Sequence, residues 1–302
     1  MQPAIECLCL WSDLLGFGAA FERGNWALDS EDIQGAAARI ARIERFVFRS
    51  NSPAHEYVLV LNDGIARSLD LPPAESRALR GLLQWLQSAL TNHWQINAFE
   101  QDNGQPGMRS VLCVGQRMGL RDATKTTLSQ VFAGENAAIA LAGDISVYSP
   151  LQFQLNLAFS KAYIIEGLGK AKGLGGPALF VEGAAIVGLN QLINASEEST
   201  DPDRILVESS IQARDDALVF LVTVSHRGIQ KESLAIEFDA QGIDVNHRGI
   251  VAEMYRVVRF NPLDEGSEFW FDFTDYQYDQ SLRIEDPVNG DYIDPKGARR
   301  LR

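Results

Sequence analysis

The sequence predicts an α+β protein, with helices on at least one face of a sheet and extra strands toward the C-terminus. Short apolar runs typical of buried strands alternate with segments whose apolar residues recur at helical spacing. A succession of β-forming runs then fills most of the last third of the chain. No internal repeat or low-complexity linker interrupts the sequence, and 302 residues can form one large domain or two small ones.

The first predicted strand begins at Ile5 and ends at a carboxylate, Asp13, followed at once by Gly16, Phe17 and Gly18. An unpaired Asp is costly in a core, but it is well placed to hold a cation. The glycines allow backbone N–H groups to approach a ligand closely, as phosphate-binding turns require. This stretch is therefore the first candidate for a functional site.

The next elements follow from helical spacing and from turn signals. Acidic residues and Ser30 predict the start of an amphipathic helix at 32–49. Asn62-Asp63-Gly64 separates two β-forming runs and predicts a hairpin with a carboxylate at its tip. Leucines at helical spacing predict a helix over 74–94, and residues 120–144 are hard to place. The other expected elements are strands at 109–115, 178–182, 205–210, 217–224, 233–238, 250–258 and 268–273, a helix at 152–166, and a possible helix around 128–141.

Composition limits the partners. The formal net charge of -13 and the pI near 4.8 argue against coating a nucleic acid or an anionic membrane, but they allow a small polyanionic substrate. Cys7, Cys9 and Cys113 lie in apolar runs without ligand spacing, so we expect buried reduced thiols. No basic and apolar leader pattern and no run of membrane length is visible, so we expect a cytoplasmic protein.

Asp13 and Asp63 form the candidate metal site. If their strands are neighbours, both carboxylates reach the same edge of the sheet, where their repulsion suits a divalent cation. Two Mg²⁺ or Mn²⁺ ions held there would suit phosphoryl chemistry on a polyphosphate. The histidines at 55, 93, 226 and 247 show no ligand spacing and are not expected to bind metal.

The order of five motifs resembles the catalytic domain of class III nucleotidyl cyclases. Residues 12–17 resemble the family's Asp-x-x-Gly-Phe metal motif, and residues 61–64 resemble its Gly-Asp hairpin, with Asn62 in place of glycine. The other three are the strand 109–115 ending in glycine, the Asn-x-Ala motif at 155–158, and the closing hairpin around Arg248-Gly249 with its Val-x-x-Tyr-x-Val-like strand.

The resemblance implies a ferredoxin-like or palm-like sheet with helices on one face. It implies a catalytic domain at 1–260, with an insertion around 116–145, and a C-terminal extension at 261–302. It also implies a homodimer with composite sites, in which a ribose 3′-oxygen attacks the α-phosphate of a nucleoside triphosphate to give a 3′,5′-cyclic nucleotide and pyrophosphate.

Residue roles follow from the same resemblance. Asp13 and Asp63 would hold the metals with the Leu14 carbonyl, and the 16–18 backbone would cradle the β- and γ-phosphates. Asn156 would orient the ribose or the reacting phosphate from the opposite subunit, and Arg248 would contact the terminal phosphates.

The chain departs from the family pattern at two places. Ser160 stands where a transition-state arginine is expected, and the adjacent Lys161 is the candidate replacement. The two adenine-reading positions fall near Leu59 and Ser149, whose side chains cannot make those contacts. The pattern is therefore similar to the pyrimidine cyclases of bacterial anti-phage defence, the Pycsar systems, which make cyclic UMP or cyclic CMP.

Two other functions stay open: a purine cyclase with rearranged base recognition, and an inactive cyclase-fold module that senses a nucleotide or mediates dimerisation. Each site residue also has an ordinary explanation. Asp13 and Asp63 suit turns, Asn156 suits a helix-side hydrogen bond, and Arg248 and Lys161 suit a solvated surface.

Overall fold

The computed structural model describes residues 4–49, 56–118, 138–141, 145–148, 152–195, 205–214, 216–226, 230–264 and 270–276. In this part of the chain one sheet has the strand order β2-β3-β1-β4-β7-β12-β10-β9-β8, with β11 and β13 also paired to β12. The pairings are antiparallel except for β4 with β7. The strands of this sheet are β1 (Ala4–Leu14), β2 (Glu56–Leu61), β3 (Gly64–Asp70), β4 (Met108–Met118), β7 (Leu179–Glu182), β8 (Ile205–Ala213), β9 (Ala217–His226), β10 (Gln230–Asp239), β11 (Ile243–His247), β12 (Ile250–Asp264) and β13 (Phe271–Asp272).

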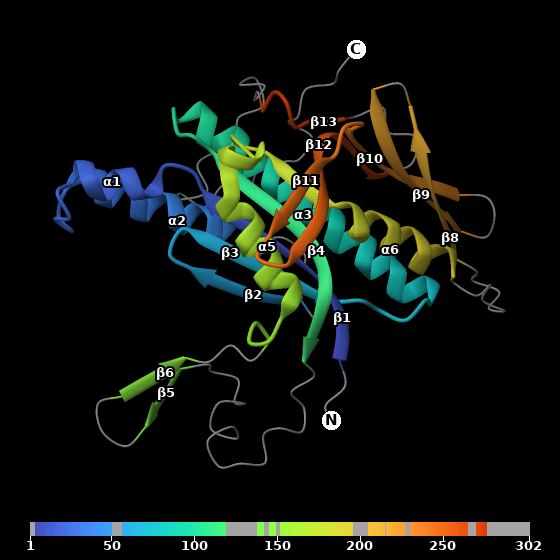
Figure 1. Cartoon of the computed structure of the whole chain (residues 1–302), viewed down its shortest axis with the longest axis horizontal. Coiled ribbons are helices and arrows are strands. Elements are labelled where there is room, and N and C mark those ends of the chain that lie inside the picture. Colours follow the sequence, from blue (N-terminus) through green and yellow to red (C-terminus); the bar gives the residue numbers. More distant parts are fainter. Residues whose placement is uncertain are drawn as a thin grey trace.

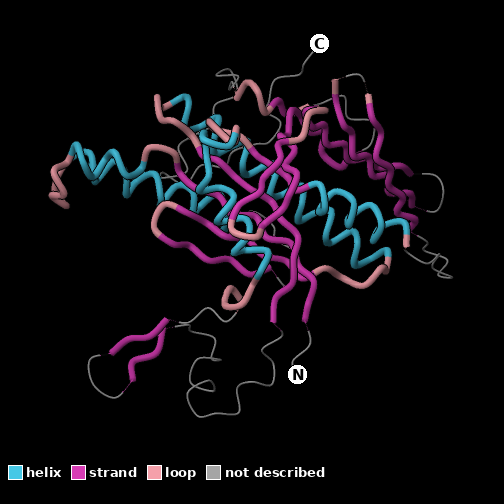
Figure 2. Tube along the Cα trace, viewed as in Figure 1, coloured by secondary structure: helices cyan, strands magenta, loops and turns pink. Residues whose placement is uncertain are grey.

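Helices cover both faces of this sheet (Figures 1 and 2). On one face, α3 (Ser76–Asp102) and α6 (Gly183–Asn194) pack on Leu8, Leu10 and Leu112. At one end of that face, α1 (Phe17–Arg23) and α2 (Glu31–Arg49) pack around Leu14. The opposite face, formed by the alternate residues of the same strands, packs on α5 (Leu157–Leu168). The α+β prediction with helices on at least one face is confirmed, and the helices lie on both faces rather than on the single face that the family resemblance implied.

Small residues explain why α5 can lie on the second face. Ala158 and Ala162 are fully buried on its inner side. Gly115 of β4 faces them, and a Cβ added there would lie 2.8 Å from the Ala158 amide nitrogen. The close approach therefore depends on glycine at 115.

Most predicted elements are present, with differences at their ends. The helix expected at 74–94 continues to Asp102, and the helix expected from 152 begins only at Leu157, because Asn156 caps it. Residues 138–141, placed at the end of a possible helix, form the strand β5, which pairs with β6 (Ile145–Tyr148). The helix α6 was not predicted. Of the strand expected at 268–273, the structure describes residues 270–273, and among these β13 takes up two.

The described part of the expected C-terminal extension belongs to the main core. The strand β12 runs through position 260 to Asp264. Phe271, Phe273 and Tyr276 are buried in the same cluster as α3 and α6. A boundary at 260 stays a prediction, and residues 277–302 lie outside the described residues.

The three cysteines are free and buried, as predicted. Burial raises the pKa of the Cys7 thiol to about 11, so it stays protonated at neutral pH. None of the described helices is long and apolar enough to cross a membrane.

Candidate active site

The structure places Asp13 and Asp63 at the same end of the sheet. Asp13 lies opposite Gly64 of β3 and opposite Arg109 of β4. The β2–β3 turn folds against the end of β1, where the Leu14 amide donates to the Asp63 carbonyl oxygen at 3.1 Å. Asn62 permits this turn by adopting a φ of 52°, a left-handed conformation that Asn enters more easily than most residues.

The surroundings of Asp13 disfavour its negative charge. The pKa of Asp13 is raised from 3.8 to about 7, chiefly by burial and then by the charges of Glu166 and Asp63, while the charge of Arg109 lowers it. A cation bound beside Asp13 would offset both the lost hydration and the repulsion. This environment fits a hard divalent cation, which prefers carboxylate and carbonyl oxygens.

The described residues do not form a complete set of metal ligands by themselves. Within the described residues, no three His, Cys, Asp or Glu side chains lie close enough together to hold a metal ion. Asp13, Asp63 and the Leu14 carbonyl would therefore supply only part of a coordination sphere. Mg²⁺ sites commonly use one or two carboxylates and take further oxygens from substrate phosphates and water, so this donor set fits.

Sequence reasoning missed one charged pair at this end of the sheet. Arg109 donates from Nε to Glu166 Oε1 at 2.8 Å and makes a second, shorter bond to the same oxygen from Nη2. Glu166 belongs to the last turn of α5 and is 5% exposed. Its place ahead of a glycine made it look like an ordinary helix end. Only the packing of α5 across the sheet brings it to Asp13.

The glycine turn after Asp13 begins a short helix. Gly16 adopts a φ of 69° and precedes α1, and a Cβ there would lie 3.0 Å from Pro106 Cγ. Phe17 is buried, whereas Gly18 is exposed. The Arg39 Nη2 atom donates to the Leu15 carbonyl at 3.1 Å and fixes the turn from α2. The phosphate cradle at 16–18 stays a prediction.

The other predicted groups lie at the opposite end of the sheet. Asn156 contacts Cys7 of β1, and Asp13 lies six positions further along this strand. At about 3.4 Å per residue, the separation is roughly 20 Å. Arg248 also lies at this far end. Arg256 of β12 pairs with Phe180 of β7. From Arg256 back to Arg248, the chain runs toward the start of β1 and therefore away from Asp13.

Asn156 has a structural task. Its Oδ1 atom accepts the Phe159 amide at 2.9 Å, which caps α5. Its Nδ2 atom donates to Ser68 Oγ and to the Gln152 carbonyl, and the side chain is fully buried. The amide is bonded within the chain in this structure, and the contact with a ribose or phosphate stays a prediction.

Lys161 also forms an ion pair within the chain. Its Nζ atom lies 2.6 Å and 2.9 Å from the two carboxylate oxygens of Glu182, whose side chain is 4% exposed. Moving Lys161 to a substrate would leave a buried carboxylate unpaired, at a cost of about 3–5 kcal/mol. In this structure Lys161 neutralises Glu182, and its role as a catalytic cation stays a prediction.

Arg248 is exposed at the tip of the β11–β12 hairpin. Arg248 and Gly249 have φ values of 49° and 81° and form the two-residue loop between the paired residues His247 and Ile250. The hairpin was predicted correctly, and the guanidinium is accessible to an anion.

The two base-reading positions give no support for contact with a base. Leu59 is 7% exposed and belongs to the core cluster beneath α5. Ser149 lies outside the described residues.

A buried polar network supports the carboxylate end from behind. Ser12 and Ser110 face each other across β1 and β4, on the sheet face opposite Asp13, with their Oγ atoms 2.7 Å apart. His93 Nδ1 lies 2.8 Å from Ser110 Oγ, and Tyr276 OH lies 3.2 Å from His93 Nε2. Burial lowers the pKa of His93 to about 3, so the ring is neutral.

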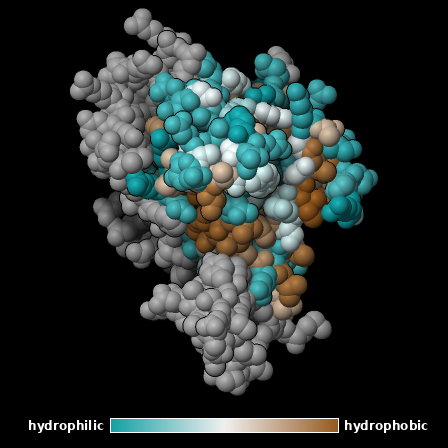
Figure 3. All heavy atoms as spheres, turned by 90° about the vertical axis from the view of Figure 1, so that its left-hand side faces the viewer, coloured by the Kyte–Doolittle hydropathy of each residue, from teal (hydrophilic) through white to brown (hydrophobic). Residues whose placement is uncertain are grey.

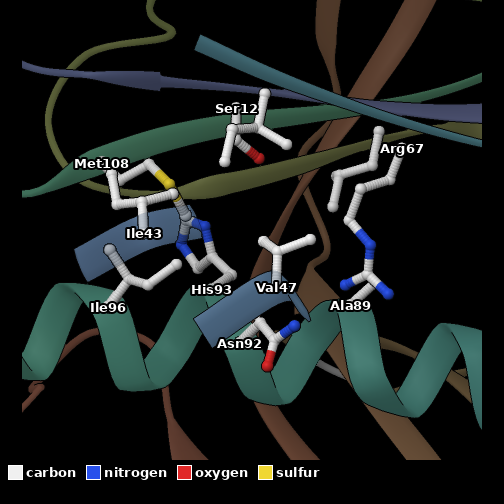
Figure 4. A pocket seen from close by; sticks show the side chains of 11 residues that line it. Ser12, Ile43, Val47, Arg67, Ala89, Asn92, His93, Ile96 and Met108 are labelled. Atoms are coloured by element: carbon white, nitrogen blue, oxygen red, sulfur yellow. The ribbon is translucent and has the colours of Figure 1, made fainter. Parts of the chain in front are cut away.

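Asn97 fixes the tautomer of this ring. Its Oδ1 atom accepts the Met108 amide, so its Nδ2 atom must be the group that donates to His93 Nε2 at 2.9 Å. His93 therefore carries its proton on Nδ1. Figure 4 shows Ser12, His93 and Met108 around a cavity of about 10 Å³, which is room for about one water molecule.

Comparisons with known proteins gave loose structural likenesses. No protein-family model matches the chain, and no curated protein matches it. The adenylyl cyclase CyaB from P. aeruginosa overlays with a TM-score of 0.43 at 8% identity, over 85% of this chain and 96% of that one. The guanylyl cyclase Cya2 gives 0.39 at 11% identity, over 89% and 98%. A bacterial light-regulated adenylyl cyclase gives 0.41 at 11% identity, over 85% and 52%. None of these likenesses assigns the chain to a family.

Proposed function

We propose that this protein is a class III nucleotidyl cyclase that converts a nucleoside triphosphate into a 3′,5′-cyclic nucleotide and pyrophosphate. The observation that carries the proposal is the convergence of Asp13 and Asp63 at one end of the sheet, in surroundings that raise the pKa of Asp13 to about 7. Such a pair favours a divalent cation and, through it, a polyphosphate.

The chain's own residues would bind and orient the triphosphate. Asp13, Asp63 and the Leu14 carbonyl would hold Mg²⁺ or Mn²⁺, two per site, which stabilise charge on the attacking and leaving oxygens when bound. The backbone at 16–18 would lie against the β- and γ-phosphates. Arg248 would place its guanidinium on the terminal phosphates, since its planar fork suits phosphate oxygens.

The proposal includes a homodimer, because these groups are separated within one chain. Arg248 lies at the end of the sheet away from Asp13, so one chain cannot bring both to one triphosphate. Two chains arranged head to tail would make two composite sites. Large apolar side chains are available for such an interface on α5 and the turn before it, because Leu155, Leu157 and Tyr163 are 64%, 61% and 52% exposed. Figure 3 shows hydrophobic atoms gathered near the centre of one face.

The substrate we propose is UTP or CTP. Leu59 is apolar and buried, and Ser149 has neither the length nor the charge of an adenine-reading residue. The product, cyclic UMP or cyclic CMP, would act as a second messenger in bacterial antiviral defence, read by a separate effector protein in the cytoplasm. A purine cyclase with rearranged base recognition is the competing proposal within the same chemistry.

A second candidate function is an inactive cyclase-fold module that senses a nucleotide or mediates dimerisation. Three observations favour it: Ser160 replaces the expected arginine, Lys161 is bound to Glu182, and Asn156 is buried as a helix cap. If this function is correct, a nucleotide binds without turnover.

The test is an assay of pyrophosphate release with each of the four ribonucleoside triphosphates and Mn²⁺. We expect turnover of UTP or CTP that is lost in Asp13→Ala and Asp63→Ala and retained in Asp29→Asn, an exposed control. Turnover of ATP or GTP in preference would remove the pyrimidine assignment. If the protein binds a nucleotide but turns over none of the four, the inactive cyclase-fold module is the function that remains.

A further inference from the structure

Arg109 and Asp13 are direct neighbours across β1 and β4, yet Arg109 bonds to another residue. Side chains opposite each other in an antiparallel pair have Cβ atoms about 4.5–5.5 Å apart, within reach of an ion pair. Both bonding nitrogens of Arg109 instead contact Glu166 Oε1. Within the described residues, no hydrogen bond or ion pair joins Arg109 to Asp13.

Two features of α5 draw the guanidinium of Arg109 away from the strand. Glu166 supplies a carboxylate whose side chain is 7% exposed, and Arg109 itself is 13% exposed, so water screens this pair only weakly. The end of α5 supplies the second attraction, because a cation is favoured beside the carbonyl end of a helix. Gly169, with a φ of 50°, ends α5, and a Cβ there would lie 3.5 Å from the Nη atoms of Arg109.

This placement matters because an arginine and a metal ion compete for one carboxylate. An Arg–Asp pair with two parallel hydrogen bonds is among the strongest ion pairs in proteins. If Arg109 took that geometry on Asp13, a divalent cation would have to displace it. Glu166 prevents this competition by balancing the arginine charge from the opposite side.

We propose that Glu166 is a positioning residue of the metal site, which holds the Arg109 guanidinium off Asp13 and so leaves the Asp13 carboxylate open to a divalent cation. This inference rests on the proposed function, because it takes Asp13 as the metal ligand. It assigns no metal contact to Glu166 itself.

A direct role of Glu166 as a third ligand is the competing explanation. Within the part of the chain that the structure describes, Asp13, Asp63 and Glu166 do not approach closely enough to form a three-carboxylate metal site. The two explanations predict different Mn²⁺ binding for a variant in which the charge of Arg109 is also removed. Without the arginine charge, a positioning role for Glu166 disappears, whereas a ligand role does not.

The experiment compares Glu166→Gln, Arg109→Gln and the double variant. Binding of Mn²⁺ alone, without nucleotide, is followed by the electron paramagnetic resonance signal of the free ion, and thermal unfolding shows that each variant is folded. We expect Glu166→Gln to bind Mn²⁺ at least tenfold more weakly than the wild type. The double variant should bind at least as tightly as the wild type, because its uncharged pair leaves Asp13 without a competing cation.

Three results would overturn the inference. A double variant as weak as Glu166→Gln would make Glu166 a ligand. Unchanged Mn²⁺ binding in Glu166→Gln would make the ion pair purely structural. Weaker binding in a folded Arg109→Gln would show that the arginine does not compete. Should Arg109→Gln fail to fold, because Glu166 is left buried and unpaired, the comparison of Glu166→Gln with the double variant decides alone.

The failure of the inference is distinguishable from the failure of the proposed function. Wild-type protein that does not bind Mn²⁺, or Asp13→Ala that binds like the wild type, overturns the metal assignment and the inference together. Wild-type binding that is lost in Asp13→Ala keeps the metal assignment. The Glu166 and Arg109 variants then test the inference by itself.

Discussion

Replacing Asp13 with Asn should stabilise the metal-free protein at alkaline pH. The pKa of Asp13 is raised from 3.8 to about 7 in the folded protein, chiefly by burial and then by Glu166 and Asp63. A raised carboxyl pKa means that the folded state loses stability as pH rises from about 4 to about 7. At 1.36 kcal/mol per pH unit, this interval corresponds to about 4 kcal/mol. Asp13 is partly exposed, so we halve the figure for solvent screening and expect about 2 kcal/mol.

The assay is urea unfolding with EDTA at intervals between pH 4 and pH 8. The free energy of unfolding of Asp13→Asn minus that of the wild type should be near zero at pH 4, rise through neutrality and level off by pH 8. Asp29→Asn, at an exposed position before α2, should show no such rise. Mn²⁺ at pH 8 should then stabilise the wild type and not Asp13→Asn, since the cation replaces the missing counter-charge.

A flat difference across this pH range would refute the reasoning, because it would mean that Asp13 is already ionised and compensated in the metal-free protein. An Asp13→Asn variant that is less stable than the wild type at pH 8 would refute the reasoning more strongly. It would show that the ionised carboxylate of Asp13 stabilises the metal-free fold instead of destabilising it.

Three further predictions concern ion pairing, packing and assembly. Lys161→Met should lower the free energy of unfolding, measured by urea titration, by about 3–5 kcal/mol, because the buried carboxylate of Glu182 loses its partner. The double variant with Glu182→Gln should regain most of this lost stability. Gly115→Ala should cost about 1–3 kcal/mol, since its Cβ would meet the backbone of α5, and should shift the thermal midpoint accordingly. Mixing inactive Asp13→Ala with inactive Arg248→Ala should restore cyclase turnover, because mixed dimers hold one intact composite site.

Matched controls separate these effects from general damage. Lys170→Met removes an exposed lysine and should leave stability within about 0.5 kcal/mol. Gly188→Ala places a Cβ in open space inside α6 and should stabilise slightly. A mixture of the Asp13 and Arg248 variants that stays inactive, although pull-down of one tagged variant recovers the other, would contradict the composite site.

Local signals in the sequence predicted the carboxylate end of the fold well. An apolar strand ending in Asp13 and a hairpin with Asp63 at its tip need only period-two alternation and turn chemistry, and the structure contains both. Arg109 and Glu166 could not be found in this way. They lie 57 positions apart and meet only because α5 crosses the second face of the sheet.

The partners of the predicted groups at the other end were missed for the same reason. Asn156 and Lys161 carry side chains that suit a ligand, and sequence reasoning had no means of seeing their partners within the chain. Asn156 bonds to Ser68, on a strand far back in the sequence, and Lys161 bonds to Glu182. A polar residue near a motif is a poor candidate for a ligand when long-range packing has already satisfied it.

The buried His93 network has a consequence for folding order. Tyr276 is 183 positions from His93, and Asp272, whose carbonyl accepts the Trp94 indole N–H at 2.8 Å, is 178 positions from Trp94. Contacts of such long sequence separation raise the contact order and slow folding, because a large loop must close before they form. During synthesis, the strand that carries Asp13 is made long before Asp272 and Tyr276, which complete the core behind it. A chain that ends before these residues would therefore lack a rigid carboxylate end and would be a substrate for proteolysis.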